Sequence, residues 1–359
     1  MFRPGWKPLG RIGLVLLAGG GLAAQSTPPT PAAADLESEL LALLNTPVTA
    51  ASRQSESSGR APATVVTVTA DQILRRRYRS LGEVLRDLPE FKVDNGFSVE
   101  FYNTVSVRGV MGQYKFVILM DGNRIGAATN EVIPILENFP VHFAKQVEVV
   151  YGPASALYGA DAFTGVINIV TWKGEEATDR NHARLGGGED LQGDHALAWT
   201  GRLGSAHLTV AGQYYRDSQP DLPDAYPAAY AGLQEALDTG IFDTVFGTKV
   251  ATIPYDPKYA QPIRANNAFL RLQHETWSVS LLQGWTRVPS AINYAPPNAL
   301  PIEAAHVAAR TLAVSMNHTM ALAENLELQS TLTGRRYEVD PGSMFGWKRL
   351  MNREPGSTS

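Results

Sequence analysis

The sequence predicts an α+β domain followed by antiparallel strands of a transmembrane β-barrel. Helix-like and strand-like runs are mixed over residues 58–174, as in an α+β domain. Over residues 175–344, apolar and polar residues alternate in runs of about ten, separated by short turns and longer loops. The soluble alternative for this pattern is a β-sandwich with one buried face. Glycine and proline number 32 and 23 while charged residues make up only 18%, a composition typical of a turn-rich β protein.

The N-terminus has the pattern of a secretory signal over residues 1–24. Three basic residues provide its positive start: Arg3, Lys7 and Arg11. An apolar run follows and ends in small residues, so we expect cleavage after Ala23 or Ala24. The alternative is a short membrane anchor, but the apolar run is shorter than the roughly 20 residues that a spanning helix needs.

Residues 25–57 are expected to form a flexible segment. The stretch 25–35 is rich in Pro, Ser, Thr and Ala and cannot support a packed core. Leucines over 36–44 favour a short amphipathic helix. In the run Thr46–Ser52, Pro47 lacks an N–H and favours extended backbone. A mobile extended run of this kind is suited to adding as a strand to the sheet edge of a partner.

The next elements begin with a strand at Val65–Val68. Thr69 and Gln72 have the spacing of a capping box, which predicts a helix from Ala70. Ser80 and Glu83 have the same spacing and predict a second helix that Pro89 ends. The arginines between these helices are expected to be a solvated helix end: Arg75, Arg76, Arg77 and Arg79.

Two further strands and a turn follow. Val105–Gly109 alternates as a strand, and the apolar run Phe116–Met120 leads into Asp121-Gly122, a strong hairpin turn. We expect a short helix over Ile133–Phe139. Four aromatic residues fall in the loops of this region: Phe97, Phe101, Tyr102 and Tyr114.

The stretch Gln146–Gly174 is the most informative part of the chain. It predicts two strands joined by a short turn or helix, with glycines and a proline at the sharp bends. It resembles the C-terminal signature of the plug domain of TonB-dependent outer-membrane receptors. Val105–Gly109 and the Asp121-Gly122 hairpin resemble two further plug motifs. The signature matches at Glu148, Val149, Gly152, Pro153, Tyr158, Gly159, Ala162, Gly165, Val166, Ile167, Asn168, Ile169 and Thr171.

This resemblance implies a receptor that takes up a scarce ligand, such as a ferric siderophore or cobalamin, across the outer membrane. The plug would fill residues 58–174 and the barrel would begin at 175. The four loop aromatics would be candidates to stack on the ligand, or else to pack against the barrel wall. Arg108 matches a plug arginine that pairs with barrel carboxylates, while Tyr151 stands where many relatives have a second arginine. The TonB protein would be the partner of a TonB box formed by Thr46, Pro47, Val48, Thr49, Ala50, Ala51 and Ser52.

The barrel part is short for such a receptor. Plugged transporters have 22 strands, whereas residues 175–344 supply roughly seven or eight. The tail 345–359 shows no alternation. We therefore expect an incomplete barrel, from a fragment, a truncated or frameshifted product, or half of a split barrel.

Other functional classes find little support. A net charge of −4 gives no reason to expect a nucleic-acid partner, and the chain has no cysteine. The sequence lacks a nucleophile elbow, a P-loop and metal-ligand spacing among its seven histidines, so we expect no enzyme, cofactor or metal site. A TonB-linked signalling receptor and a soluble periplasmic binding protein remain the alternatives.

Overall fold

A computed structural model describes residues 44–52, 55–98, 101–127, 134–177, 180–228, 230, 235, 239, 241–244, 247–250, 260–290 and 302–343. These residues belong to one compact unit that begins at Leu43. The predicted signal, residues 25–43 and the tail 345–359 lie outside the described residues. The side chains of Phe97, Phe101 and Tyr102 also lie outside them.

A five-stranded sheet forms the centre of the first domain. Its order is β3 (Thr64–Thr69), β9 (Ala144–Tyr151), β10 (Gly165–Thr171), β7 (Phe116–Met120) and β8 (Asn123–Arg124). β10 lies antiparallel to β9 and parallel to β7, so the signature stretch supplies the two middle strands. Both strands are buried almost throughout, including their polar residues Gln146, Glu148 and Asn168.

Two helices cover one face of this sheet: α2 (Ala70–Arg76) and α3 (Leu81–Arg86). The first predicted capping box is confirmed, because Thr69 Oγ1 accepts from Gln72 N and Gln72 Oε1 accepts from Thr69 N. The second is wrong. Ser80 caps nothing, and the Glu83 carboxylate accepts the N–H of Arg79 at 2.7 Å instead.

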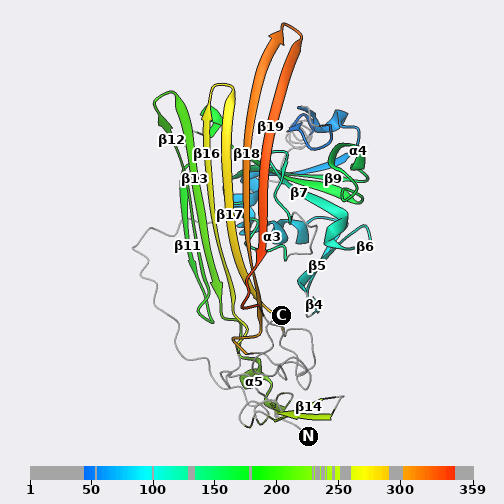
Figure 1. The fold of residues 1–359 in the computed structure, drawn as a ribbon, viewed down its shortest axis with the longest axis vertical. Helices are drawn as coiled ribbons and strands as arrows, with labels where there is room; N and C mark the ends of the chain where they lie inside the picture. Colours follow the sequence, from blue (N-terminus) through cyan, green and yellow to red (C-terminus); the bar gives the residue numbers. More distant parts are fainter. Residues whose placement is uncertain are drawn as a thin grey trace, which may run out of the picture. The chain divides into compact units, whose positions relative to one another are not determined.

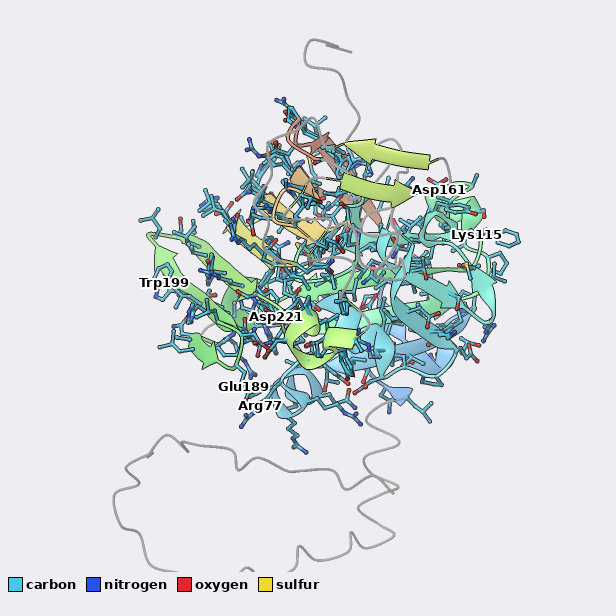
Figure 2. The ribbon with its side chains drawn as sticks, turned by 90° about the horizontal axis from the view of Figure 1, so that it is seen from below. Arg77, Lys115, Asp161, Glu189, Trp199 and Asp221 are labelled. Carbon is cyan, nitrogen blue, oxygen red and sulfur yellow. The ribbon has the colours of Figure 1, made fainter. Side chains whose placement is uncertain are left out.

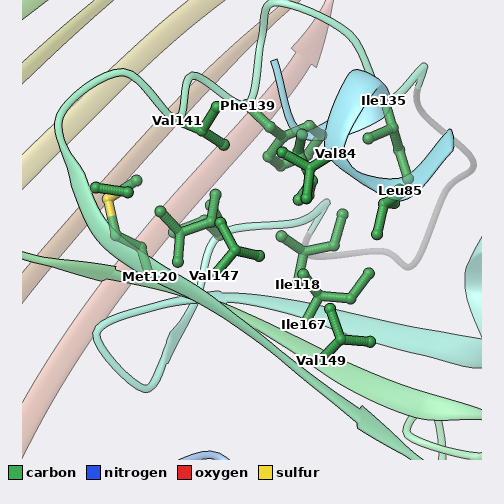
Figure 3. Close-up of a cluster of buried hydrophobic side chains, with 14 of the residues drawn as sticks. Val84, Leu85, Ile118, Met120, Ile135, Phe139, Val141, Val147, Val149 and Ile167 are labelled. Atoms are coloured by element: carbon green, nitrogen blue, oxygen red, sulfur yellow. The ribbon is translucent and has the colours of Figure 1, made fainter. Parts of the chain in front are cut away.

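The apolar side chains of α3 meet the sheet directly. Figure 3 shows Val84 and Leu85 over Ile118 and Ile167, and all four are buried. The core extends to the seven-stranded sheet that follows this domain in the chain. There the ring of Phe269 stacks on that of Phe143, with centroids 4.7 Å apart.

The helix expected over 133–139 is wrong for its described part. Residues 134–139 form a turn, because the Asn138 amide bonds the backbone at both ends. Its Oδ1 accepts from Leu136 N at 2.9 Å, and its Nδ2 donates to Pro134 O at 2.8 Å. Side-chain bonds of this kind compete with helical ones.

Smaller elements complete the first domain. β1 (Pro47–Val48) pairs with β2 (Glu56–Ser57). A second small sheet consists of β4 (Phe91–Ser98), β5 (Phe101–Val107) and β6 (Val110–Met111). The short helices are η1 (Ser58–Arg60), η2 (Gln113–Lys115), α4 (Ser155–Tyr158) and η3 (Gly174–Ala177).

A seven-stranded antiparallel sheet follows η3 (Figure 1). Its strands pair in chain order: β11 (His182–Gly187), β12 (Gly193–Leu203), β13 (Ala206–Asp217), β16 (Ile263–His274), β17 (Trp277–Pro289), β18 (His306–Ala323) and β19 (Leu326–Val339). Figure 2 shows Trp199 of β12 on the side of the sheet away from the first domain.

The connections of this sheet differ at its two ends. Tight turns join β12 to β13, β16 to β17 and β18 to β19. At the other end, long connections join β13 to β16 and β17 to β18. The first long connection contains α5 (Leu222–Ala225) and the hairpin of β14 (Ile241–Thr244) and β15 (Gly247–Val250). This asymmetry is typical of outer-membrane barrels.

Side chains alternate between the two faces of the seven-stranded sheet. In β16, Ile263, Ala265 and Phe269 are buried toward the first domain, whereas Leu270 and Leu272 are exposed on the other face. We call the second face the outward face. The predicted period of two is therefore confirmed, with an apolar outward face as the sequence pattern required.

Candidate functional site

The run Thr46–Ser52, called here the N-terminal segment, lies packed against the five-stranded sheet. Val48 and Ala50 are almost completely buried, and Ala51 is nearly so. Ala50 and Ala51 belong to an apolar cluster with Val117 and Val166 of β7 and β10. In Figure 1 the segment, in blue, lies beside α4 toward the end of the large sheet that carries the tight turns.

Glu148 holds the backbone of this segment. Its carboxylate is 1% exposed and accepts from Thr49 N at 3.1 Å and from Ala50 N at 2.9 Å. The Thr49 hydroxyl adds a third bond at 3.3 Å. Burying a carboxylate is costly unless donors surround it, so these contacts stabilise both the segment and the acid.

Two amide side chains complete the environment of Glu148. Gln146 Nε2 donates to Glu148 Oε1 at 2.8 Å and also to the Pro47 carbonyl at 2.8 Å. Asn168 Nδ2 donates to Glu148 Oε2 at 3.2 Å. Gln146 and Glu148 are two residues apart on β9 and therefore point to the same side of the strand. The alternation of side chains along β9 thus places Gln146 and Glu148 together beside the N-terminal segment.

Asn168 also reaches the Asp121-Gly122 turn. Its Oδ1 accepts from Gly122 N at 3.0 Å. Asp121 and Gly122 have positive φ values of 48° and 80°, as the predicted tight hairpin requires. The Asn168 amide therefore bonds the Asp121-Gly122 turn through its oxygen and Glu148 through its nitrogen.

Asp121 forms a buried ion pair with Arg271 of β16. Their side chains are 4% and 3% exposed, and Asp121 also accepts from Thr171 N and Thr171 Oγ1, each at 2.9 Å. Burial alone would raise the pKa of Asp121, but Arg271, Lys173 and the Thr171 bond outweigh it and lower that pKa. This buried ion pair thus joins strand β16 of the large sheet to the first domain.

These contacts form one continuous polar chain. It runs from Arg271 to Asp121, through Gly122 to Asn168, and on to Glu148 and the N-terminal segment. Asp121 and Asn168 were predicted as structural residues of the motif. The sequence gave no signal for Arg271, because an arginine inside an alternating strand is typical of any lumen-facing position.

Arg108 lies elsewhere. Its Nε donates to Glu90 Oε2 at 2.5 Å, and its guanidinium lies 5.2 Å from the centre of the Tyr151 ring. All three residues belong to the first domain. Among the described residues Arg108 makes no ion pair with the seven-stranded sheet, so the expected pairing with barrel carboxylates is not present there.

Arg79 corrects the prediction of a solvated helix end. Its guanidinium binds Glu83 and lies 5.1 Å from the centre of the Tyr215 ring on β13. Gln213 Nε2 of the same strand donates to the Arg79 carbonyl at 3.3 Å. Arg79 is half-buried because its guanidinium contacts both the Glu83 carboxylate and Tyr215 of the large sheet.

The glycines of the signature have clear structural reasons. Gly152 and Gly159 have φ values of 109° and 88°, which side chains rarely adopt. A Cβ on Gly165 would lie 2.4 Å from the Val150 carbonyl oxygen. Pro153 follows the first bend, and Tyr158 is buried at the end of α4.

Of the four aromatic candidates, only the side chain of Tyr114 is described. It is 47% exposed, and the Lys115 ammonium lies 5.5 Å from its ring centre. No group of acidic, histidine or cysteine side chains able to hold a metal occurs in the described part of the chain. No helix there is long and apolar enough to span a membrane.

Comparison with known proteins agrees with this architecture. Residues 58–166 match the family described as the TonB-dependent Receptor Plug Domain. The ferric preacinetobactin receptor BauA of Acinetobacter baumannii aligns with a TM-score of 0.55 at 15% identity, covering 82% of this chain and 40% of that one. The ferric yersiniabactin uptake receptor FyuA of Yersinia pestis aligns with a TM-score of 0.50 at 16% identity, covering 77% and 41%.

The chain spans about two fifths of the length of these solved receptors. At such identities the two alignments show a shared fold, which joins the plug to the strands of the same barrel type. Proteins with this plug are outer-membrane receptors rather than enzymes. Residues 58–166 match the receptor plug domain family, and with the strands that follow, the chain shares the fold of the corresponding part of these outer-membrane receptors.

Proposed function

We propose that the chain serves TonB-dependent uptake of a scarce ligand, with the N-terminal segment as the contact for TonB. In this proposal the plug occupies residues 58–174, the barrel begins at residue 175, and the segment before the plug carries the pulling force. The ligand class is a ferric siderophore. Cobalamin-like ligands are the second candidate within the same mode of action.

The observation that carries this proposal is the mode of attachment of the N-terminal segment. A single carboxylate, Glu148, accepts both Thr49 N and Ala50 N, while the apolar side chains at this point are small. A segment held mainly by a few hydrogen bonds to one carboxylate is released at a cost of about 1.5–3 kcal/mol for each bond. Its free backbone groups then suit pairing with the sheet edge of a partner.

The ligand class is supported by the similar solved receptors. Both BauA and FyuA are described as receptors for ferric siderophores, ferric preacinetobactin and ferric yersiniabactin. Tyr114, beside Lys115, offers an exposed aromatic face with a nearby cation, which suits an anionic aromatic chelate. We extend the ligand site to Phe97, Phe101 and Tyr102 from their places in the sequence alone.

The test of the TonB contact is a cross-linking experiment on the full chain in outer membranes. The chain has no cysteine, so a single cysteine replacing Thr46 reports contact with cysteine variants of the TonB C-terminal domain. Val48→Pro removes an N–H that strand addition needs, and we expect the cross-linked product to fall about tenfold.

Ala61→Pro is the matched control. Ala61 already has φ of −57°, which proline favours, and it lies beyond the segment. Equal loss of cross-linking in both variants, or no loss in Val48→Pro, would contradict the proposed contact. Uptake is tested separately with radioactive iron loaded on a panel of catecholate and hydroxamate chelators, in cells that lack other receptors.

A further inference from the structure

Three arginines form a ladder on the outward face of the seven-stranded sheet. Arg216 of β13 is directly opposite Arg264 of β16, and Arg264 is directly opposite Arg287 of β17. Neighbouring strands are about 4.8 Å apart, so the three Cα atoms lie within about 10 Å of one another. All three residues lie near the strand ends that lead into the long connections.

The ladder lies just beyond the apolar band of this face. On β17, Trp277 and Trp285 are eight residues apart on the same face, about 27 Å along the strand at about 3.4 Å per residue. Val279 and Leu281 lie between them. Aromatic residues flank a lipid-facing band about 25 Å tall in outer-membrane barrels.

The ladder follows this aromatic limit on two strands. Arg287 is the next outward residue after Trp285, and on β13 Arg216 is the next outward residue after Tyr214. The long connections mark the external end of such barrels. The arginine ladder is therefore at the level of the lipid headgroups of the outer leaflet.

The positive charge of the ladder is only partly compensated. Like charges directly opposite one another on neighbouring strands are destabilising. The Glu303 carboxylate forms ion pairs with Arg264 at 3.3 Å and with Arg287 at 2.8 Å. Among the described residues no carboxylate pairs with Arg216. Within the described part of the chain, these three cations and Glu303 leave an excess of two positive charges.

The hydrogen bonding of the ladder is also incomplete. The Nε atoms of Arg216, Arg264 and Arg287 are all buried and have no hydrogen-bond partner within the described structure. A row of guanidinium groups presents parallel N–H donors in the geometry that phosphate oxygens accept in pairs. An anionic group bound at the outer ends of these side chains would reduce the repulsion within the row.

We propose that the ladder binds the phosphate-bearing headgroup of an outer-leaflet lipid. The acyl chains of that lipid would lie on the apolar residues below the ladder, among them Val210, Leu270 and Leu281. Phosphate on a lipid fits both halves of this surface, the cationic row and the apolar band next to it. This site is on the outside of the barrel and does not depend on the proposed uptake of a ligand.

The test uses the full chain extracted from outer membranes in detergent. The probe is an acylated, bisphosphorylated glucosamine disaccharide in mixed micelles, with binding followed by native mass spectrometry. Arg216→Gln, Arg264→Gln and Arg287→Gln together should weaken binding at least about tenfold, because each removes a charge-assisted phosphate contact. The three lysine substitutions keep the charge and should retain most of the binding.

The control variant removes the same charge from the plug, with Arg60→Gln, Arg75→Gln and Arg77→Gln, all exposed. It should bind the lipid as the unmodified chain does. If the triple ladder variant does not fold, Arg216→Gln alone carries the test, because no described ion pair depends on it. The phosphate-free form of the lipid should bind the chain and the ladder variant equally.

Three outcomes would overturn the proposal. The first is unchanged lipid binding by the triple ladder variant, or by Arg216→Gln where that variant carries the test. The second is equal loss in the plug control. The third is displacement of the lipid by millimolar inorganic phosphate, which would identify a site for a free anion instead of a lipid headgroup.

Discussion

Glu148 is the residue on which the attachment of the N-terminal segment depends. It is a buried acid whose donors come from the segment, from Gln146 on its own strand and from Asn168 on the neighbouring strand. The sequence placed Glu148 in a motif, and its partners became clear only from the fold. Residues almost a hundred positions apart meet there, and no local spacing in the sequence encodes that meeting.

Replacing Glu148 by alanine should release the segment. Ala51 is 8% exposed, so a cysteine at this position reports docking through its rate of reaction with a maleimide. Loss of the buried bonds to Thr49 and Ala50 should speed labelling at least about tenfold, given about 1 kcal/mol or more per bond. A cysteine at Leu74, which is 73% exposed on α2, should react at the same rate in both backgrounds. An unchanged rate at position 51 would contradict the role of Glu148.

Asp121 should make the stability of the chain sensitive to acid. Its folded pKa is lowered, against burial, by Arg271 and Lys173. Its contribution is therefore complete above the unfolded value of 3.8 and is lost as the pH falls through the folded value. Denaturant unfolding followed by tryptophan fluorescence down to about pH 2 should show this loss. Asp121→Asn should remove the corresponding slope; the same slope in that variant would refute the assignment.

Glu137 should act in the opposite direction. Burial raises its pKa to about 7 from 4.5, so the folded chain keeps a proton that the unfolded chain releases. Stability should therefore fall as the pH rises from about 4.5 to about 7, by about 3 kcal/mol. Glu137→Gln should remove this fall and stabilise the chain at pH 8. Unfolding midpoints at a series of pH values test it, and a Glu137→Gln midpoint that still falls with pH would count against it.

At the scale of the element, the strands of the five-stranded sheet are built for close approach. β10 begins at Gly165, where the backbone of β9 leaves no room for a Cβ. This explains the glycine at the start of an otherwise apolar strand. The same crowding makes the pairing of β9 and β10 sensitive to a single methyl group.

Gly165→Ala should destabilise the plug by about 2 kcal/mol or more, because a Cβ 2.4 Å from a carbonyl oxygen forces the backbone to shift. Gly126→Ala is the matched control, since open space surrounds that position. Urea unfolding of both variants gives the comparison. Equal midpoints for the two would show that β10 can move without cost.

The sequence predicted the elements with strong local signals. The first capping box, the Asp121-Gly122 hairpin and the alternating strands were all found because each depends on neighbours in the chain. The second capping box and the helix at 134–139 failed where side chains found other partners. The Glu83 carboxylate accepts the N–H of Arg79, and the Asn138 amide bonds the backbone of its own turn. Contacts between the plug and the large sheet, such as Arg79 with Tyr215, have no local signature.

At the scale of the whole molecule, the polar chain connects the barrel strand β16 to the N-terminal segment. The side chains of Arg271, Asp121, Asn168 and Glu148 are buried, and Asn168 is the only described side chain that bonds both Gly122 and Glu148. This arrangement predicts that a change at the barrel wall affects the docking of a segment on the other side of the plug sheet.

Arg271→Ala should leave Asp121 buried without its partner, which costs about 3–5 kcal/mol. We expect faster maleimide labelling of a cysteine at Ala51 in this variant, as in Glu148→Ala. Combined with Asn168→Ala, the two effects should be non-additive, because both act through one chain of bonds. Additive effects in this double-mutant cycle would show that the two ends are independent.

The position of β3 at the edge of the five-stranded sheet has a mechanical consequence. β3 is the first strand of that sheet after the N-terminal segment, and it pairs with β9 alone. Tension applied at Thr46 would therefore reach β3 before any other strand of this sheet. Detachment of β3 would break only its six residue pairs with β9, while β9, β10 and β7 would keep their own pairing. The pairing of β3 with β9 would then be the first in this sheet to separate under tension.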